Sequence, residues 1–247
     1  MDFSKTKFRA SSWGNLLTET KDKKGLGVTC QKELLKIYNR EVYGWDEDIT
    51  TPAMEKGTIV QPESILMYSK VEGKFFTENT QELENEWFKG TPDVFLGYSI
   101  ETASQVDDMK NSWSLKTFTS KMIDPIDNGH KAQLNVYFSL SGATTGNIVH
   151  TLISMPQEMF KQECDRLLWK MANKGQIATE YAPEYLEAVE QLKKQHLYDH
   201  IDQRERVFKQ PIERDEELIE KMKAKVPIFR QWLEDFHRNH MSLYPKT

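Results

Sequence analysis

Two acidic residues and a lysine are spaced so that they could act together on a substrate. Asp93 ends the segment GTPD just before an apolar run, and Asp108 and Lys110 lie in the next apolar run, on either side of Met109. Side chains two residues apart in a strand share a face, so Asp108 and Lys110 would point the same way and Met109 would point into the core. This spacing is typical of a site that combines carboxylates with an amine.

The two apolar runs predict a hairpin with strands over 92–100 and 105–111. Pairing would bring Asp93 opposite Asp108, and two close carboxylates repel each other unless a proton or a cation separates them. Mg²⁺ prefers oxygen ligands and can polarise a phosphoryl oxygen or help to ionise water. The lysine could orient that water or offset the developing negative charge. The alternative is an exposed hairpin with scattered charges, because so short a pattern also arises by chance.

A third carboxylate, Glu63, lies in a stretch over 53–72 that predicts a helix which kinks or restarts at Pro62. Glu63 falls between Val60 and Met67 on the predicted apolar face, where a carboxylate is costly unless it is paired or metal-bound. We therefore expect Glu63 to turn toward the two aspartates. A glutamate in a first helical turn, stabilised by the helix macrodipole, explains the same residue equally well.

A helix predicted over 130–141 follows the hairpin and carries Gln133 and Tyr137. Residues four apart share a helix face, so these two polar groups would lie together. An ordinary amphipathic helix with a tyrosine at the edge of the core is the alternative.

The remaining pattern alternates helices and strands without a repeat, a low-complexity tract or a linker. Helices are predicted over 10–20, 29–43, 157–173, 183–196 and 215–239, and strands over 147–155 and 206–212, the last at a sheet edge because it contains Pro211. One α/β domain over residues 1–247 is the simplest interpretation.

Composition excludes several classes of protein. Of 247 residues, 38% are hydrophobic and 29% charged, which is typical of a globular chain rather than a disordered one. The two cysteines, Cys30 and Cys164, are far apart, which excludes a disulfide scaffold, a zinc ribbon and an iron–sulfur cluster. No run suits a membrane span or a signal peptide, so we expect a cytoplasmic protein. A net charge of −5 does not indicate nucleic-acid binding, but a basic groove remains compatible with it.

Taken in order, these pieces resemble a known family. Four pieces of the sequence are similar to the motifs of the PD-(D/E)XK nuclease superfamily. They are Glu63 on an early helix, the strand end Gly90-Thr-Pro-Asp93, the strand Asp108-Met-Lys110, and the helix pair Gln133 and Tyr137. The likeness is greatest to its RecB-type, YqaJ-like phage exonuclease branch, which includes lambda exonuclease. The resemblance implies a restriction-endonuclease-like core, with a mixed central β-sheet flanked by helices, N-terminal helices and a C-terminal helical extension.

The resemblance also implies an activity. It is that of a metal-dependent DNA exonuclease of the phage recombination type, which hydrolyses phosphodiester bonds from duplex ends. Mg²⁺, with Mn²⁺ as a substitute, would be held by Glu63, Asp93, Asp108 and the Met109 carbonyl, and Lys110 would position the attacking water. Double-stranded DNA ends would be the substrate, a single-strand annealing protein a partner, and a homo-oligomer the assembly.

DNA contacts are implied at two further places. Gln133 and Tyr137 would brace the site or touch the DNA backbone. The segment KFRASSWGNLLT resembles one that holds the DNA 5′ phosphate, which points to Arg9, Ser11 and Ser12. An arginine beside a helix N-terminus is a reasonable phosphate pocket, and a simple helix N-cap is the alternative.

Several alternatives stay open. An endonuclease of the same superfamily, or an inactive nuclease fold that only binds DNA or protein, would carry the same motifs. Asp107 could replace Asp108 if the strand contained a bulge. The isolated His130 and His150 are interpreted as structural, and Trp113 as a packing residue rather than a DNA contact.

Overall fold

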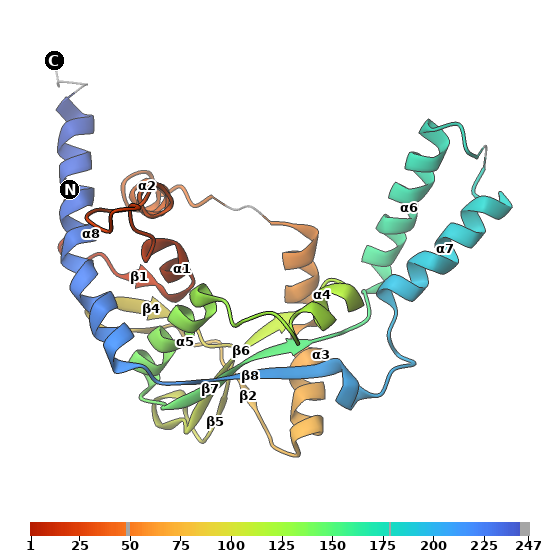
Figure 1. Cartoon of the computed structure of the whole chain (residues 1–247), viewed down its shortest axis with the longest axis horizontal. Helices are drawn as coiled ribbons and strands as arrows, with labels where there is room; N and C mark the ends of the chain where they lie inside the picture. Colours follow the sequence, from red (N-terminus) through yellow and green to blue (C-terminus); the bar gives the residue numbers. More distant parts are fainter. Residues whose placement is uncertain (48–49, 178, 243–247) are drawn as a thin grey trace.

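A computed structural model describes residues 1–47, 50–177 and 179–242 (Figure 1). The helices are α1 (Trp13–Leu16), α2 (Val28–Tyr43), α3 (Pro52–Glu72), α4 (Leu115–Ser120), α5 (Asn128–Ser141), α6 (Gln157–Asn173), α7 (Pro183–His196) and α8 (Glu216–Ser242), with short 3₁₀ turns η1 (Ala10–Ser12), η2 (Ile100–Thr102) and η3 (Gln203–Arg206). The strands are β1 (Phe8–Arg9), β2 (Thr77–Glu78), β3 (Leu83–Glu84), β4 (Phe88–Gly90), β5 (Val94–Leu96), β6 (Gln105–Asn111), β7 (Thr145–Thr151) and β8 (Val207–Glu213).

The main sheet of the described chain is mixed, with strand order β2-β5-β6-β7-β8. Strands β5 and β6 form the predicted antiparallel hairpin, β6 and β7 run parallel, and β8 returns antiparallel at the edge. Pro211, which has no N–H to donate, is tolerated at that edge. A smaller sheet has the order β1-β4-β3.

Helices α3 and α5 cover opposite faces of the main sheet. On one face, Tyr68 of α3 packs with Met109 and Val149. On the other, α5 connects β6 to β7 and packs its Leu134 and Phe138 close to Gly146, where an added Cβ would lie 3.1 Å from each. The arrangement confirms the expected α/β fold with a mixed sheet flanked by helices.

Most predicted elements are present, and the differences have local causes. The helix predicted over 10–20 ends at Leu16, after a 3₁₀ turn, and α3 continues through Pro62 without ending. Helix α4 was not predicted, although Ser114 and Thr117 form a capping box at its start. The predicted strand over 147–155 is shifted toward the N-terminus and ends at Thr151.

Helices α6 and α7 form a pair that projects from the sheet at the end of the molecule opposite α8 (Figure 1). Tyr185 of α7 donates a hydrogen bond to the Cys164 carbonyl of α6 at 3.1 Å, which ties the two helices together. No helix in the described ranges is long and apolar enough to cross a bilayer.

Candidate metal and catalytic site

The hairpin places both predicted aspartates on one face of the sheet. Val94 pairs with Asp107, so Asp93, which directly precedes β5, falls opposite Asp108. Val94 packs on the α3 face, and the alternation of side chains turns Asp93 to the α5 face. The Asp93 Oδ2 accepts a hydrogen bond of 2.7 Å from the Met109 N–H, which fixes the carboxylate beside β6.

Asp108 is held by two further predicted residues. Its Oδ2 lies 2.7 Å from the Lys110 ammonium, and its Oδ1 accepts a hydrogen bond of 2.8 Å from the Gln133 amide on α5. The same amide nitrogen donates to the Tyr137 hydroxyl at 2.9 Å. Asp108 is 1% exposed and the Lys110 side chain 32% exposed, so the acid is buried and the amine reaches solvent.

Crowding of the two carboxylates shows in their electrostatics. Burial, and then the Asp108 charge, raise the pKa of Asp93 from 3.8 to about 7. Burial works against the charge of Lys110, but the charge and hydrogen bond of Asp108 and the charge of Asp93 together outweigh it and raise the pKa of the amine. In the metal-free protein this favours the ammonium form of Lys110, which can donate hydrogen bonds.

Asp107 points to the opposite face, and β6 contains no bulge that would exchange the two acids. Its side chain is fully buried and accepts four hydrogen bonds. Oδ1 accepts from the Asn147 N–H and side-chain amide, and Oδ2 accepts from Tyr68 and Gln105. Asp107 thus joins α3, β6 and β7, and it has no free oxygen for another ligand.

Asp107→Asn should lower the free energy of unfolding by about 2–4 kcal/mol, because either orientation of the amide sets its NH₂ against other donors. Urea denaturation followed by circular dichroism measures the change. Asp108→Asn is the matched control, since the new amide keeps an acceptor for Gln133 and the partly exposed Lys110 can turn from the NH₂ to solvent, and we expect a much smaller loss of stability. Equal losses for both variants would contradict the structural role of Asp107.

Glu63 does not lie on the buried face of α3, so that prediction is wrong. Its side chain is exposed, as is Ile59 one turn earlier. The buried face instead carries two polar residues, Lys56 and Ser64, whose partners are the Ser112 and Val60 carbonyls. The apolar pattern misjudged the phase of the helix because part of the buried face is polar.

The expected DNA-contact residues take different positions. Tyr137 is 4% exposed, and its ring lies against Gly90, where an added Cβ would be 2.9 Å from it and 2.9 Å from Ala10. Tyr137 therefore braces the site from within, whereas Gln133 is half-buried. The glycine of the GTPD segment is required by this close approach.

Arg9, Ser11 and Ser12 gather at the start of the chain, next to the N-terminal end of α5. Gly14 and Gly129 meet there so closely that a Cβ on Gly14 would lie 2.8 Å from the Gly129 Cα. Arg9 forms an ion pair of 2.9 Å with Asp46. Neither serine caps a helix through its side chain. Phosphate binding by these three residues stays a prediction.

Three polar residues lie near the site although the sequence pattern does not place them there. His130 precedes Gln133 by one turn on α5, and burial, reinforced by the Lys110 charge, lowers the pKa of its imidazole. His150 pairs in register with Lys110, and Gln210 binds His150. Local spacing predicts isolated histidines, because the parallel register of β6 and β7 cannot be obtained from it.

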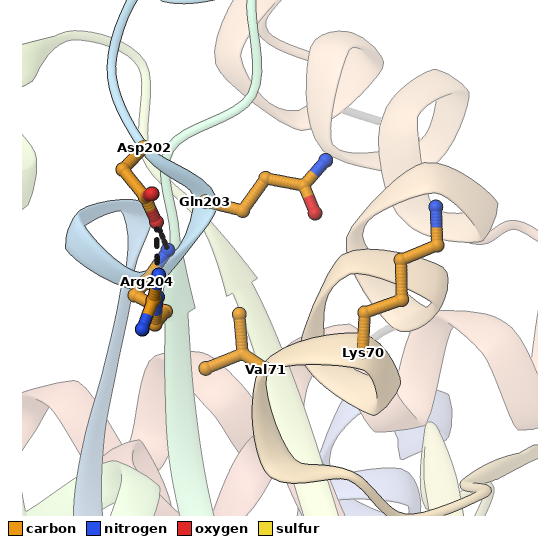
Figure 2. Close-up of a pocket in the computed structure, with 5 residues that line it drawn as sticks. All are labelled: Lys70, Val71, Asp202, Gln203 and Arg204. Atoms are coloured by element: carbon orange, nitrogen blue, oxygen red, sulfur yellow. Dashed lines mark hydrogen bonds and ion pairs between the residues drawn. The ribbon is translucent and has the colours of Figure 1, made fainter.

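A hollow lies elsewhere, between the end of α3 and the turn η3 (Figure 2). Its volume is about 540 Å³, and its lining is Lys70, Val71, Asp202, Gln203 and Arg204. Figure 2 shows Asp202 and Arg204 paired with each other. None of the candidate site residues lines the hollow, and nothing in its lining indicates a ligand.

The donors present at the site fit a hard divalent cation. Asp93 and Asp108 supply carboxylates, and the Asp108 Oδ2 makes no hydrogen bond beyond its ion pair with Lys110. The N–H and C=O of one strand residue point to the same side, so the Met109 carbonyl also faces Asp93. Within the described ranges, no group of three or more His, Cys, Asp or Glu side chains meets at one point, so the main-chain carbonyl would complete the oxygen set.

Solved structures of two exonucleases are similar to this chain in fold. A phage-related exonuclease from Haemophilus somnus 129PT superimposes with a TM-score of 0.69 at 20% identity, over 95% of this chain and 96% of that chain. The alkaline exonuclease LHK-Exo from Laribacter hongkongensis has a TM-score of 0.61 at 17% identity, over 97% and 96%.

The chain has the fold of these exonucleases. LHK-Exo in complex with dAMP superimposes with a TM-score of 0.59, at 17% identity over 96% of this chain and 94% of that chain. No sequence model of a protein family matches the chain, and no curated protein matches it. The likeness to known proteins is therefore one of fold, and the activity has to be argued from the site.

Proposed function

We propose that this protein is a metal-dependent DNA exonuclease that hydrolyses phosphodiester bonds from duplex ends. The observation that carries the proposal is the meeting of Asp93, Asp108 and Lys110 on one sheet face, with Gln133 fixing the buried acid. The shared fold with two exonucleases supports it. Mg²⁺ is the proposed cofactor, with Mn²⁺ as a substitute.

Each residue has a physical role in this proposal. Asp93, Asp108 and the Met109 carbonyl would hold the cation, which supplies Lewis-acid polarisation of the phosphate and a water of lowered pKa. The Lys110 ammonium group would orient that water and offset the charge that grows on the phosphate. Gln133 keeps the Asp108 oxygens in position, and the buried Tyr137 hydroxyl keeps Gln133 in position.

End-labelled linear duplex DNA should be degraded with Mg²⁺ and left intact with EDTA, because both carboxylates need a cation to act on phosphate. Closed circular DNA of the same sequence should survive, which would separate an exonuclease from an endonuclease. Nicking or linearisation of the circle would contradict the exonuclease proposal.

The same assay tests the predicted pocket at Arg9, Ser11 and Ser12. We expect a 5′-phosphorylated end to be digested faster than a 5′-hydroxyl end, since the arginine and hydroxyls can hold the phosphate. Equal rates would contradict the phosphate pocket without contradicting the metal site. A partner annealing protein, a homo-oligomer and a single domain over residues 1–247 are further parts of the proposal that rest on the family resemblance.

A further inference from the structure

The sheet face that carries Asp108 and Lys110 has two more buried polar side chains that the proposed chemistry does not use. His150 of β7 pairs with Lys110, and Gln210 of β8 pairs with Ile148, which itself pairs with Asp108. His150 is 2% exposed and Gln210 8% exposed. Polar groups at this depth are costly unless they are hydrogen-bonded, so their partners are informative.

These partners form one connected chain. The Gln210 amide nitrogen donates to the carbonyls of Lys121 and Asp124, each at 3.3 Å. Both amide hydrogens are then used, so the Gln210 Oε1 must accept from the His150 Nε2–H, 3.0 Å away. Burial lowers the pKa of His150, which favours the neutral ring that this tautomer requires. We call this pair the His150–Gln210 clamp.

The clamp holds the loop that enters α5. The middle of this loop has no apolar anchor, because Met122 is 46% exposed and Ile123 is 87% exposed, and only Ile126, close to α5, packs against the core. Its main chain is attached to the sheet by Gln210. Three residues beyond Asp124, Asp127 caps α5 by accepting from the Gly129 N–H at 2.8 Å.

The first turns of α5 face the site. His130 lies in the first turn, and one turn later Gln133 donates to Asp108 at 2.8 Å. A shift of the entering loop would therefore move the amide that orients the buried carboxylate. Displacements of about 1 Å at a catalytic group can slow a reaction by up to roughly 100-fold.

We propose that His150 and Gln210 are positioning residues for the nuclease reaction, acting through the main chain of Lys121 and Asp124 on the start of α5 and so on Gln133 and Asp108. This inference rests on the proposed function. The clamp residues touch neither metal nor DNA in this role. They hold the first turn of α5 in position.

The alternative is a clamp that only stabilises the sheet. A purely structural pair would change the free energy of unfolding and leave the turnover of folded enzyme unchanged. Kinetic and exchange measurements on the full-length chain separate these two roles.

His150→Phe keeps an aromatic ring, which stacks on Phe208 in the native protein, but removes the donor. Gln210→Leu removes the whole link to the loop. We expect each variant to lower kcat on linear duplex DNA about 10- to 100-fold with KM unchanged. The double variant should be no slower than the slower single variant, because both act through one chain of contacts. His150→Gln should recover most of the activity, since its amide can replace the Nε2–H.

Tyr185→Phe is the matched control, because it removes one hydrogen bond of a buried side chain between α6 and α7. It should leave kcat unchanged. Hydrogen exchange read by mass spectrometry gives a measurement independent of activity. Amides of residues 121–133 should exchange faster in His150→Phe and Gln210→Leu, and at the native rate in Tyr185→Phe and His150→Gln.

Native kcat in both clamp variants, or slower turnover with native exchange in residues 121–133, would overturn the positioning role. If the unaltered protein cleaved no DNA, the proposed function would fail by itself. Faster exchange confined to residues 121–133 would then still support the clamp, and unchanged exchange would overturn it.

Discussion

Lys110→Ala should lower the rate of DNA cleavage at least about 100-fold while the affinity for DNA changes little. The ammonium group lies 2.7 Å from Asp108, so its loss removes the group that would orient water and offset charge on the phosphate. Single-turnover digestion of linear duplex DNA, with binding measured in Ca²⁺ or EDTA, separates the two quantities. This result would also exclude a nuclease fold that serves only for binding.

Lys209→Ala is the control for Lys110→Ala. Lys209 belongs to the same sheet and forms an ion pair of the same length, 2.7 Å, with Glu72. It pairs with Val149, on the α3 face, so it is remote from the aspartates. We expect native cleavage in this variant. Unchanged cleavage after Lys110→Ala would leave the protein without the proposed chemistry.

Alternation along a strand was sufficient to predict the main pair of the site. The phase of β6 places Asp108 and Lys110 together and Asp107 opposite, and the structure confirms this phase. A strand has a period of two, so a single buried residue such as Met109 fixes the direction of its neighbours. The first strand is shorter than predicted, because β5 ends at Leu96 and residues 97–104 connect it to β6 through η2, but the register still places Asp93 opposite Asp108.

The helix phase of α3 could not be predicted in the same way. The apolar stripe of a helix is wide, so apolar residues at its margins do not fix which side of the helix is buried. Here the buried face includes Lys56 and Ser64, whose polar groups are satisfied by carbonyls, while Ile59 and Leu66 are exposed. The apolar pattern therefore predicts the wrong side of the helix for Glu63, because some of its apolar residues do not mark the core.

The parallel pairing of β6 with β7 was also beyond local patterns. The 33 residues between Asn111 and Thr145 contain α4 and α5, and nothing in this connection specifies which residue of β7 meets Lys110. His150 becomes a neighbour of the site only through that register, and Gln210 only through the next one. Tertiary contacts, rather than spacing, reveal the clamp.

The raised pKa of Asp93 predicts how metal binding depends on pH. Its pKa of about 7 means that the metal-free protein carries a proton there at pH 6 and has largely lost it at pH 8. Mg²⁺ needs the deprotonated carboxylate, so binding at pH 6 should release close to one proton and binding at pH 8 almost none. The apparent affinity should fall about tenfold for each pH unit below 7 and level off above it. Titration calorimetry in two buffers of different ionisation enthalpy measures both quantities.

The raised pKa of Asp93 also makes the stability of the metal-free protein depend on pH. Between pH 3.8 and about 7, the folded protein holds a proton on Asp93 that the unfolded chain has lost. Stability therefore falls as pH rises through this range, by up to roughly 4 kcal/mol. Asp93→Asn should abolish Mg²⁺ binding and remove this fall, because an amide neither binds a proton nor supplies a charged oxygen.

Glu78→Gln removes an equal charge from β2, the neighbouring strand, but changes no proposed ligand. It should keep Mg²⁺ binding and its dependence on pH, with the midpoint slightly lower because the Glu78 charge contributes to the raised pKa of Asp93. Mg²⁺ affinity that is independent of pH between 6 and 8, or that survives Asp93→Asn, would place the cation elsewhere. Asp93 and Asp108 would then hold no metal ion, and the metal-dependent mechanism would lose its physical basis.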